Sequence, residues 1–293
     1  GYFKVENKPG FLNLSEISNL VAAFTELGVS KIRVTGGEPT VRKDFFEVLK
    51  NIKSEHKINN LVITTNGYKL NEIAEELIAT GINGINISID SLDRNKFKEI
   101  TGKDRLPQIL EGISILQSKG FKNIKINAVL LKNVNDSLEE FQSWERFINN
   151  NEIDFRYIEL MQTGDNLEYF TKYHVSASIF RKYIESTDWK EIPKISGAGP
   201  SINYVHSKFK GKFGIIAPYS KDFCSTCNRL RVTAKGELRL CLFGNTGTDL
   251  RPYLQNQSQK DELIEIILKQ LRFKKESHYL EMGNTGITPH LAS

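Results

Sequence analysis

All three cysteines of this 293-residue chain lie in one short segment, residues 224–241. Two residues separate Cys224 from Cys227, and thirteen more separate Cys227 from Cys241. A pair at this spacing can bind one metal from a tight turn, and thiolates favour zinc or iron–sulfur clusters. Structural zinc usually has four protein ligands, whereas a cubane cluster with three cysteines keeps one iron open. The spacing alone leaves open a cluster, a zinc site completed by a distant histidine, and unliganded thiols.

Two arginines, Arg229 and Arg231, follow the cysteine pair at alternate positions. Alternate residues of a strand share one face, so both guanidinium groups can reach the same anion. A pair of solvated hairpin residues is the alternative, and the positions alone do not decide between the two.

The turn Gly36-Gly37-Glu38-Pro39 is a second candidate binding segment. Its glycines allow the backbone to approach a ligand, and the Glu38 carboxylate can accept hydrogen bonds from an amine or a hydroxyl. The same residues could form a simple strand-to-helix turn. The two familiar nucleotide-binding glycine loops do not occur in the sequence.

The strands that must position these segments alternate polar and apolar residues. Their polar faces carry Lys31, Arg33, Thr64, Asn86, Ser88, Lys125, Asn127 and Arg156. Strands of a parallel sheet are normally covered on both faces and are therefore almost entirely apolar. A buried charge without a partner is destabilising by several kcal/mol. The pattern therefore predicts a curved sheet or barrel that binds a charged small molecule, with an open sheet and one solvated face as the alternative.

Strands and helices alternate through the first half of the chain, which predicts βαβ units and a parallel sheet. Helices are predicted at 15–27, 44–55, 70–80, 93–100, 107–119 and 137–149, and strands at 31–35, 61–65, 84–90, 123–131 and 153–161. After residue 162 we expect a helix at 177–187, two hairpins at 202–218 and 229–243, and a helix at 259–273. We predict two domains, residues 1–165 and 166–293, with a soft boundary between them.

The composition is that of an ordinary globular enzyme, with 39% hydrophobic and 26% charged residues. The net charge of +5 is too small and too dispersed to indicate nucleic-acid binding. We expect no membrane segment and no signal peptide, because no apolar run approaches the roughly 20 residues of a bilayer span. A reducing cytoplasm is the expected location, and clustered cysteines there favour metal over disulfides.

Several segments in the same order resemble the molybdenum cofactor biosynthesis protein A family, the GTP 3′,8-cyclases. They are KIRVTGGEPTVRKDF, TTNGY, INISIDSLD, FRYIELMQTGD, FCSTCNRLR, GELRLCLFG and NTGIT. The cysteine segment with its R-x-R is the most diagnostic of them. The resemblance implies a lyase of the radical S-adenosylmethionine class with an incomplete (βα)6 TIM-like barrel and a C-terminal α+β appendage.

The resemblance also implies the chemistry. One [4Fe-4S] cluster cleaves S-adenosylmethionine, and the 5′-deoxyadenosyl radical removes hydrogen from C3′ of GTP, after which C3′ bonds to C8. A second [4Fe-4S] cluster binds the base through its open iron, which explains why three cysteines suffice. The product is (8S)-3′,8-cyclo-7,8-dihydroguanosine 5′-triphosphate. The expected partners are an electron donor such as flavodoxin or ferredoxin, a downstream cyclic pyranopterin monophosphate synthase, and a second copy of the chain in a homodimer.

Residues of this chain match family positions one by one. The second cluster would be held by Cys224, Cys227 and Cys241. GTP would contact Lys31, Arg33, Thr64, Lys125, Arg156, Arg229 and Arg231. S-adenosylmethionine would contact Gly36, Gly37, Glu38, Ser88 and Met161.

The sequence departs from the family at both ends. The C-x3-C-x2-C motif of the first cluster and the first barrel strand are expected before Gly1, and the Gly-Gly tail usual in the family is not among residues 1–293. Three alternatives therefore stay open. They are another radical S-adenosylmethionine enzyme with an auxiliary cluster, a zinc-stabilised inactive barrel that serves as a binding module, and a phosphosugar enzyme with incidental cysteines.

Overall fold

An eight-stranded sheet forms the centre of the computed structural model, which describes residues 10–163, 166–193, 199–220, 223, 227–242 and 247–274. The strand order is β1-β2-β3-β4-β5-β8-β7-β6. The strands are β1 (Lys31–Val34), β2 (Asn60–Thr65), β3 (Gly84–Ser88), β4 (Ile124–Leu130), β5 (Asp154–Glu159), β6 (Lys190–Ile192), β7 (Ile202–Val205) and β8 (Phe213–Ile216). Strands β1 to β5 and β8 run parallel, while β7 is antiparallel to both of its neighbours.

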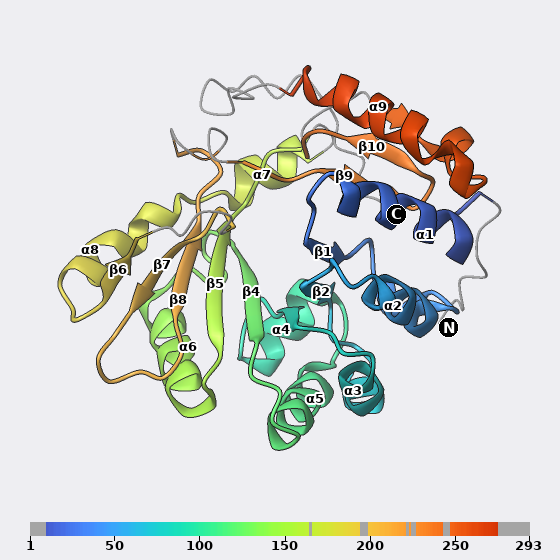
Figure 1. Cartoon of the computed structure of the whole chain (residues 1–293). Coiled ribbons are helices and arrows are strands. Elements are labelled where there is room, and N and C mark those ends of the chain that lie inside the picture. The colour runs from blue at the N-terminus through green and yellow to red at the C-terminus, as the bar shows by residue number, and fades with distance from the viewer. Residues whose placement is uncertain are drawn as a thin grey trace.

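Helices follow the parallel strands and cover one side of the sheet (Figure 1). They are α2 (Phe45–Ser54), α3 (Leu70–Ala79), α4 (Arg94–Thr101), α5 (Leu106–Ser118) and α6 (Leu138–Asn151). After β5 come α7 (Leu167–Tyr173), the short 3-10 helix η2 (Ala177–Phe180) and α8 (Arg181–Glu185). Another 3-10 turn, η1 (Pro39–Val41), precedes α2.

The alternating strand residues face the helices and form the main apolar core. Ile85 and Ile87 of β3 and Ile126 of β4 are almost fully buried in it. Because side chains alternate along a strand, the polar residues between them face the opposite side, which we call the inner face of the sheet.

The C-terminal part forms a second, smaller core around α1 (Leu14–Glu26). Its elements are β9 (Arg231–Val232), β10 (Glu237–Arg239), β11 (Thr248–Asp249), the 3-10 turns η3 (Arg251–Tyr253) and η4 (Gln257–Gln259), and α9 (Lys260–Leu271). Leu20 and Phe24 of α1 pack with Leu238 of β10 and Ile267 of α9, so segments from both ends of the described chain share this core. Figure 1 shows α1, α9 and the β9–β10 hairpin side by side.

The predicted parallel α/β fold is confirmed, and every predicted strand and hairpin is present, with bounds that differ by at most four residues. The helix predicted at 177–187 is instead divided between η2 and α8, and α7 was not predicted. The sheet contains strands from both sides of residue 165, because β8 pairs with β5. A domain boundary there stays a prediction. In the described residues, no helix is both long and apolar enough to cross a membrane.

Candidate functional site

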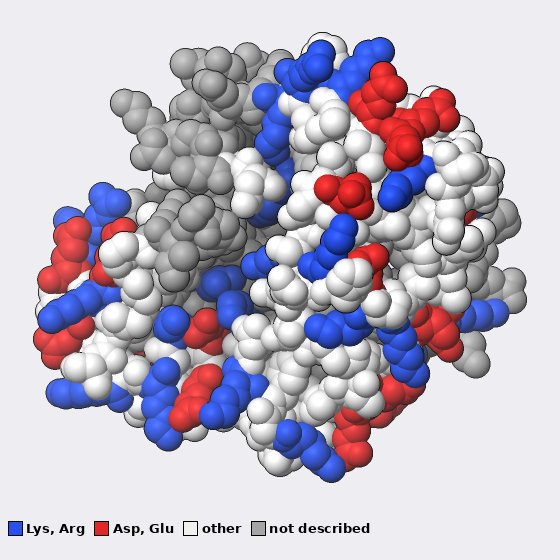
Figure 2. Space-filling model, viewed as in Figure 1, with Lys and Arg blue, Asp and Glu red and all other residues white. Residues whose placement is uncertain are grey.

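A cavity of about 700 Å³ lies between the inner face of the sheet and the β9–β10 hairpin. Seven cationic side chains line it: Lys31, Arg33, Lys125, Arg156, Arg229, Arg231 and Lys274. We call it the cationic cavity. Among the described residues that line it, none is acidic. Figure 2 shows lysine and arginine side chains gathered in the hollow near the centre of this face. The arrangement therefore suits a small molecule with several negative charges.

Strand register places the sheet-borne cations on the inner face. Asn86 lies opposite Lys125 in the β3–β4 pair, and Asn127 lies opposite Arg156 in the β4–β5 pair. On the other side of β5, Phe155 stacks on Trp144 of α6 with ring centroids 4.1 Å apart. This aromatic packing fixes the orientation of the strand, so Arg156 must face the cavity.

Arg156 occupies space that a glycine leaves free. Gly214 of β8 lies opposite Arg156, and a Cβ at that position would come within 3.0 Å of Arg156 Cγ and 2.5 Å of Ser201 Oγ. In the described part of the chain, Arg156 Nε and Asn127 Oδ1 are buried and have no hydrogen-bond partner. Buried polar groups are nearly always paired, so these two atoms indicate a ligand or ordered water in the cavity.

Two lysines of the cavity, Lys31 and Lys125, have lowered pKa values. Burial is the main reason for the lowered pKa of Lys31, and the charges of Arg33, Lys125 and Arg156 lower it further. Burial also lowers the pKa of Lys125, although Asp154, whose Oδ2 lies 3.3 Å from Lys125 Nζ, partly compensates. Asn123 Oδ1 accepts a hydrogen bond of 2.6 Å from the same ammonium group. The empty cavity therefore disfavours its own positive charges.

The pKa of Arg33 is lowered by cations on both sides of the cavity. Burial lowers its pKa most, followed by the charges of Arg156 on the sheet and of Arg229 and Arg231 on the hairpin. An anion between the two sides would remove this repulsion.

The hairpin forms the opposite side of the cavity. Leu238 of β10 pairs with Val232 of β9, and Arg239 pairs with Arg231. Lys274, just after α9, donates hydrogen bonds of 2.8 Å to Arg229 O and 3.0 Å to Leu240 O. These two bonds hold the two arms of the hairpin at a fixed separation beside the cavity.

Two of the three cysteines are described, and both Cys227 and Cys241 line the cationic cavity. Burial alone would raise the pKa of the Cys227 thiol, but hydrogen bonds and charge from Arg229 bring it below its ordinary value. Two thiols that converge from opposite arms suit a soft, thiolate-bound group such as an iron–sulfur cluster. Cys224, the third predicted ligand, lies outside the described residues.

The residues expected to contact S-adenosylmethionine lie at the carboxyl ends of the strands. Met161 lines the cavity, whereas Gly36, Gly37 and Ser88 are exposed near the ends of β1 and β3. A Cβ on Gly36 would meet no atom of the described residues within 4 Å, so among these residues the space beside this turn is open to a ligand. Carboxyl ends of strands are the usual place for ligand binding in such folds.

Glu38 joins the ends of β1 and β2. Its Oε1 accepts hydrogen bonds of 3.1 and 2.7 Å from the backbone N and Oγ1 of Thr40 and 2.7 Å from Thr65 Oγ1, and its Oε2 accepts one of 2.6 Å from Asn66 N. The carboxylate is thus already engaged with its own chain. Gly67 completes this turn at φ +72°, where a Cβ would lie 2.9 Å from Ile109.

The structure brings most of the predicted polar residues together, but not all of them line the cavity. Thr64 does not line the cavity itself but contacts the lining residue Asn86, whose Nδ2 donates a hydrogen bond of 3.1 Å to Thr64 Oγ1. Sequence reasoning gave no role to the lining residues Asn60, Asn123 and Lys274, nor to Gly214 beside Arg156. A glycine inside a strand is a signal of close approach and could have identified Gly214. Lys274 follows the last described helix, and no local pattern connects it to the hairpin.

Two family models match the chain, the radical SAM superfamily over residues 2–144 and Molybdenum Cofactor Synthesis C over residues 153–280. Among solved structures, Streptococcus suis SuiB bound to S-adenosylmethionine superposes with a TM-score of 0.62 at 16% identity. That match covers 93% of this chain and 60% of SuiB, and it supports the fold alone. The parallel α/β sheet and the first family model together define the class as radical S-adenosylmethionine proteins.

Curated relatives narrow the class. A Stenotrophomonas maltophilia protein named GTP 3′,8-cyclase is 46% identical over 99% of this chain and 89% of its own length. Proteins of the same name from Vibrio vulnificus and Haemophilus influenzae are 44% and 43% identical, and the matches cover 86% of each relative. The chain belongs to the GTP 3′,8-cyclase family.

Proposed function

We propose that this chain acts as a GTP 3′,8-cyclase of molybdenum cofactor biosynthesis and binds GTP in the cationic cavity. The observation that carries the proposal is the joint position of seven cations and two cysteines around one cavity with no acidic residue in its described lining. A triphosphate supplies the negative charge that this set of side chains lacks. Charge-assisted hydrogen bonds to phosphate oxygens are roughly twice as strong as neutral ones.

The side chains of the cavity have two roles, which are to bind the triphosphate and to orient the nucleotide. Lys31, Arg33, Lys125 and Arg156 neutralise the triphosphate from the sheet, and Arg229 and Arg231 contact the nucleotide from the hairpin. Asn127 and Arg156 find hydrogen-bond partners in the ligand for their buried, unpaired atoms. Because many fixed groups contact one ligand, the ribose is held in a single orientation.

Cys227 and Cys241, with Cys224, would hold a [4Fe-4S] cluster beside the substrate. A second [4Fe-4S] cluster with N-terminal cysteine ligands belongs to the same proposal, as does a partial barrel with one further N-terminal strand. The backbone of Gly36 and Gly37, with Ser88 and Met161, would hold S-adenosylmethionine, and Glu38 would keep the glycine turn in place. When bound, S-adenosylmethionine and its cluster supply the one-electron chemistry that begins the cyclisation.

The remaining partners are proposed from the family. They are an electron donor such as flavodoxin or ferredoxin, a cyclic pyranopterin monophosphate synthase that consumes the product, and a second copy of the chain. A cytoplasmic location stays a prediction. Iron and sulfide in anaerobically purified protein would support the cluster, whereas a colourless protein with one zinc would support a binding module instead.

The hairpin arginines provide the direct test of the proposal. Replacing Arg229 or Arg231 with alanine should weaken GTP binding by about 1–3 kcal/mol each, the range for hydrogen bonds to charged groups. Isothermal titration calorimetry of the wild type and both variants measures this loss. Arg272→Ala is the matched control, because Arg272 is exposed and does not line the cavity. Unchanged affinity in both hairpin variants would remove the arginines from the substrate site.

The lowered lysine pKa values predict a pH-dependent affinity for GTP. An anion beside Lys31 and Lys125 raises their pKa values again, so GTP binding takes up protons. Affinity is therefore greatest below the lowered pKa values of the free protein and decreases as the pH rises through them. Titrations above about pH 8, where the phosphates are fully ionised, isolate the lysine contribution.

The matching control is the Lys31→Gln, Lys125→Gln double variant. Its affinity should be lower at neutral pH and nearly independent of pH in the alkaline range. Calorimetry in buffers of different ionisation enthalpy counts the protons taken up. Equal proton uptake by the wild type and the double variant would contradict the assignment to these lysines.

A further inference from the structure

The two sides of the cationic cavity carry charges of the same sign. Lys31, Arg33, Lys125 and Arg156 come from the sheet, and Arg229, Arg231 and Lys274 come from the C-terminal part. Partly buried charges are screened by salt less than exposed ones, so the two sides repel each other when no anion is present. Contacts outside the cavity must therefore hold the hairpin over the sheet.

Helix α1 is the element that connects the two sides. Val21 packs in the main core, while Leu20 and Phe24 pack in the second core with Leu238 of the hairpin. After α1 the chain passes through Gly28 into β1, which carries Lys31 and Arg33. The position of the hairpin against α1 therefore sets its distance from the sheet. Apolar contact alone is non-directional and fixes this position only loosely.

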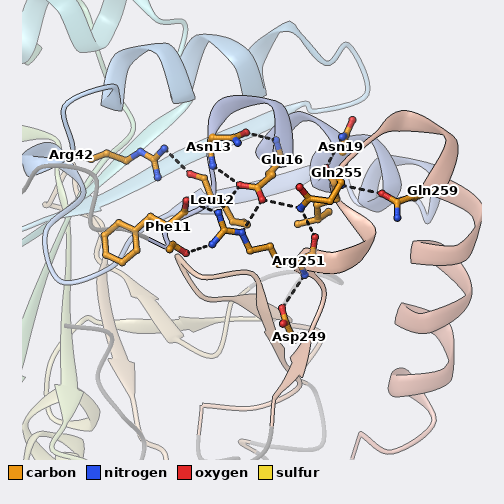
Figure 3. A network of polar contacts seen from close by, with 12 residues as sticks. Phe11, Leu12, Asn13, Glu16, Asn19, Arg42, Asp249, Arg251, Gln255 and Gln259 are labelled. Atoms are coloured by element: carbon orange, nitrogen blue, oxygen red, sulfur yellow. Dashed lines mark hydrogen bonds and ion pairs between the residues drawn. The ribbon is translucent and has the colours of Figure 1, made fainter.

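An ion pair with a buried carboxylate supplies directional contacts between these elements. The Glu16 carboxylate, 3% exposed, accepts hydrogen bonds from Arg251 at 2.8 Å (Nε to Oε1) and 3.3 Å (Nη2 to Oε2). It also accepts from Gln255 Nε2 at 3.0 Å and from the backbone N of Asn13 at 2.8 Å. Arg251 begins η3, two residues after the end of β11, so this pair joins α1 to the segment that follows the third strand of the hairpin sheet (Figure 3).

Arg251 also holds the chain segment that leads into α1. Its Nη1 donates to Gly10 O at 2.6 Å and its Nη2 to Phe11 O at 3.3 Å. Leu12 N donates to Ala234 O in the turn between β9 and β10 at 2.8 Å. The arginine side chain thus fixes the start of α1 at two backbone positions besides the carboxylate (Figure 3).

Stability alone is a weak explanation for such a pair. Desolvation of the Glu16 carboxylate offsets part of its attraction to Arg251, whose side chain is 34% exposed, and ion pairs with an exposed partner contribute little to stability. Directional bonds between fixed groups instead select one relative position of the two elements. This favours a positioning role over a purely stabilising one.

We propose that Glu16 and Arg251 form a positioning pair that sets the width of the cationic cavity and thereby its affinity for a polyphosphate. The inference rests on the proposed function for its ligand, GTP, although the pair itself lies outside the cavity. Without the pair, the repulsion between the two sides displaces the hairpin from the sheet.

Hydrogen–deuterium exchange of the Glu16→Gln and Arg251→Lys variants tests the proposal. Without ligand at low salt, amides of residues 229–241 should exchange at least about threefold faster than in the wild type, because the hairpin is less tightly held. Inorganic tripolyphosphate, or about 1 M salt with its Debye length of roughly 3 Å, should bring the rates back toward those of the wild type. The dissociation constant for GTP should rise about tenfold in both variants.

Two controls separate positioning from general destabilisation. Asp104→Asn breaks an exposed pair in which Arg94 Nε lies 2.7 Å from the carboxylate, far along the chain from the hairpin. Ile113→Val weakens the main core at α5, where Ile113 is buried. Neither change should alter exchange in the hairpin or GTP affinity at a temperature well below melting.

The proposal is overturned if amide exchange in the hairpin is unchanged in both variants of the positioning pair. It is also overturned if this exchange is faster than in the wild type by the same factor at low and at high salt. The second result would assign the pair a structural role only. If the wild type binds neither GTP nor tripolyphosphate, the proposed function fails, while the salt dependence of exchange still decides the role of Glu16 and Arg251.

Discussion

Cys241→Ser should remove one iron–sulfur cluster from anaerobically purified protein and abolish conversion of GTP. A serine hydroxyl stays protonated where a thiol ionises, and it is a poor ligand for iron in a cluster. Activity should fall by more than about 100-fold, beyond the 10- to 100-fold typical for loss of an outer-shell partner of a metal site. Iron and sulfide analysis measures the cluster, and mass spectrometry of the cyclised nucleotide measures the activity.

Thr233→Ser is the control for this experiment. Thr233 Oγ1 accepts a hydrogen bond of 3.1 Å from Glu237 N in the turn of the same hairpin, and serine keeps that hydroxyl. Its iron content and activity should match those of the wild type. A Cys241→Ser protein with full iron, full sulfide and normal turnover would show that this cysteine is not a cluster ligand.

The inner face of the sheet could be predicted because its signal is local. Period-two alternation in KIRV and IKINA places a charge between two apolar residues, so one side of each strand is apolar and can pack against helices while the charged side faces away from them. The structure therefore places Lys31, Arg33, Lys125 and Arg156 on one cavity, as the pattern indicated. The hairpin predicted at 229–243 similarly accounts for Cys227 and Cys241 lining the same cavity.

The contacts that close the cavity could not be predicted, because they depend on tertiary packing. Lys274 reaches Arg229 O across 45 residues, and Arg251 reaches Glu16 across 235. The parallel pairing of β8 with β5 also has no local signal, since a hairpin pattern specifies only the pairing of β8 with β7. Without that pairing, Gly214 cannot be recognised as the residue that makes room for Arg156.

Arg156→Met should affect GTP binding and stability in opposite directions. The substitution removes a half-buried cation that we propose contacts the triphosphate, so GTP affinity should fall by about 3 kcal/mol, or roughly 150-fold in the dissociation constant. The ligand-free protein should become more stable by about 1 kcal/mol, because a desolvated charge beside other cations is replaced by an apolar side chain of similar length. Calorimetric titration measures the first effect and urea unfolding without ligand the second.

Arg146→Met on α6 is the matched control, because Arg146 is an exposed arginine that does not line the cavity. It should change neither GTP affinity nor stability by more than about 0.5 kcal/mol. The opposite effects of Arg156→Met on GTP affinity and on stability have one cause. The positive charge of Arg156 is repelled by the other cations of the cavity in the ligand-free protein, and the same charge attracts a bound anion. A less stable Arg156→Met protein with normal GTP affinity would mean that the guanidinium group stabilises the fold and does not bind the nucleotide.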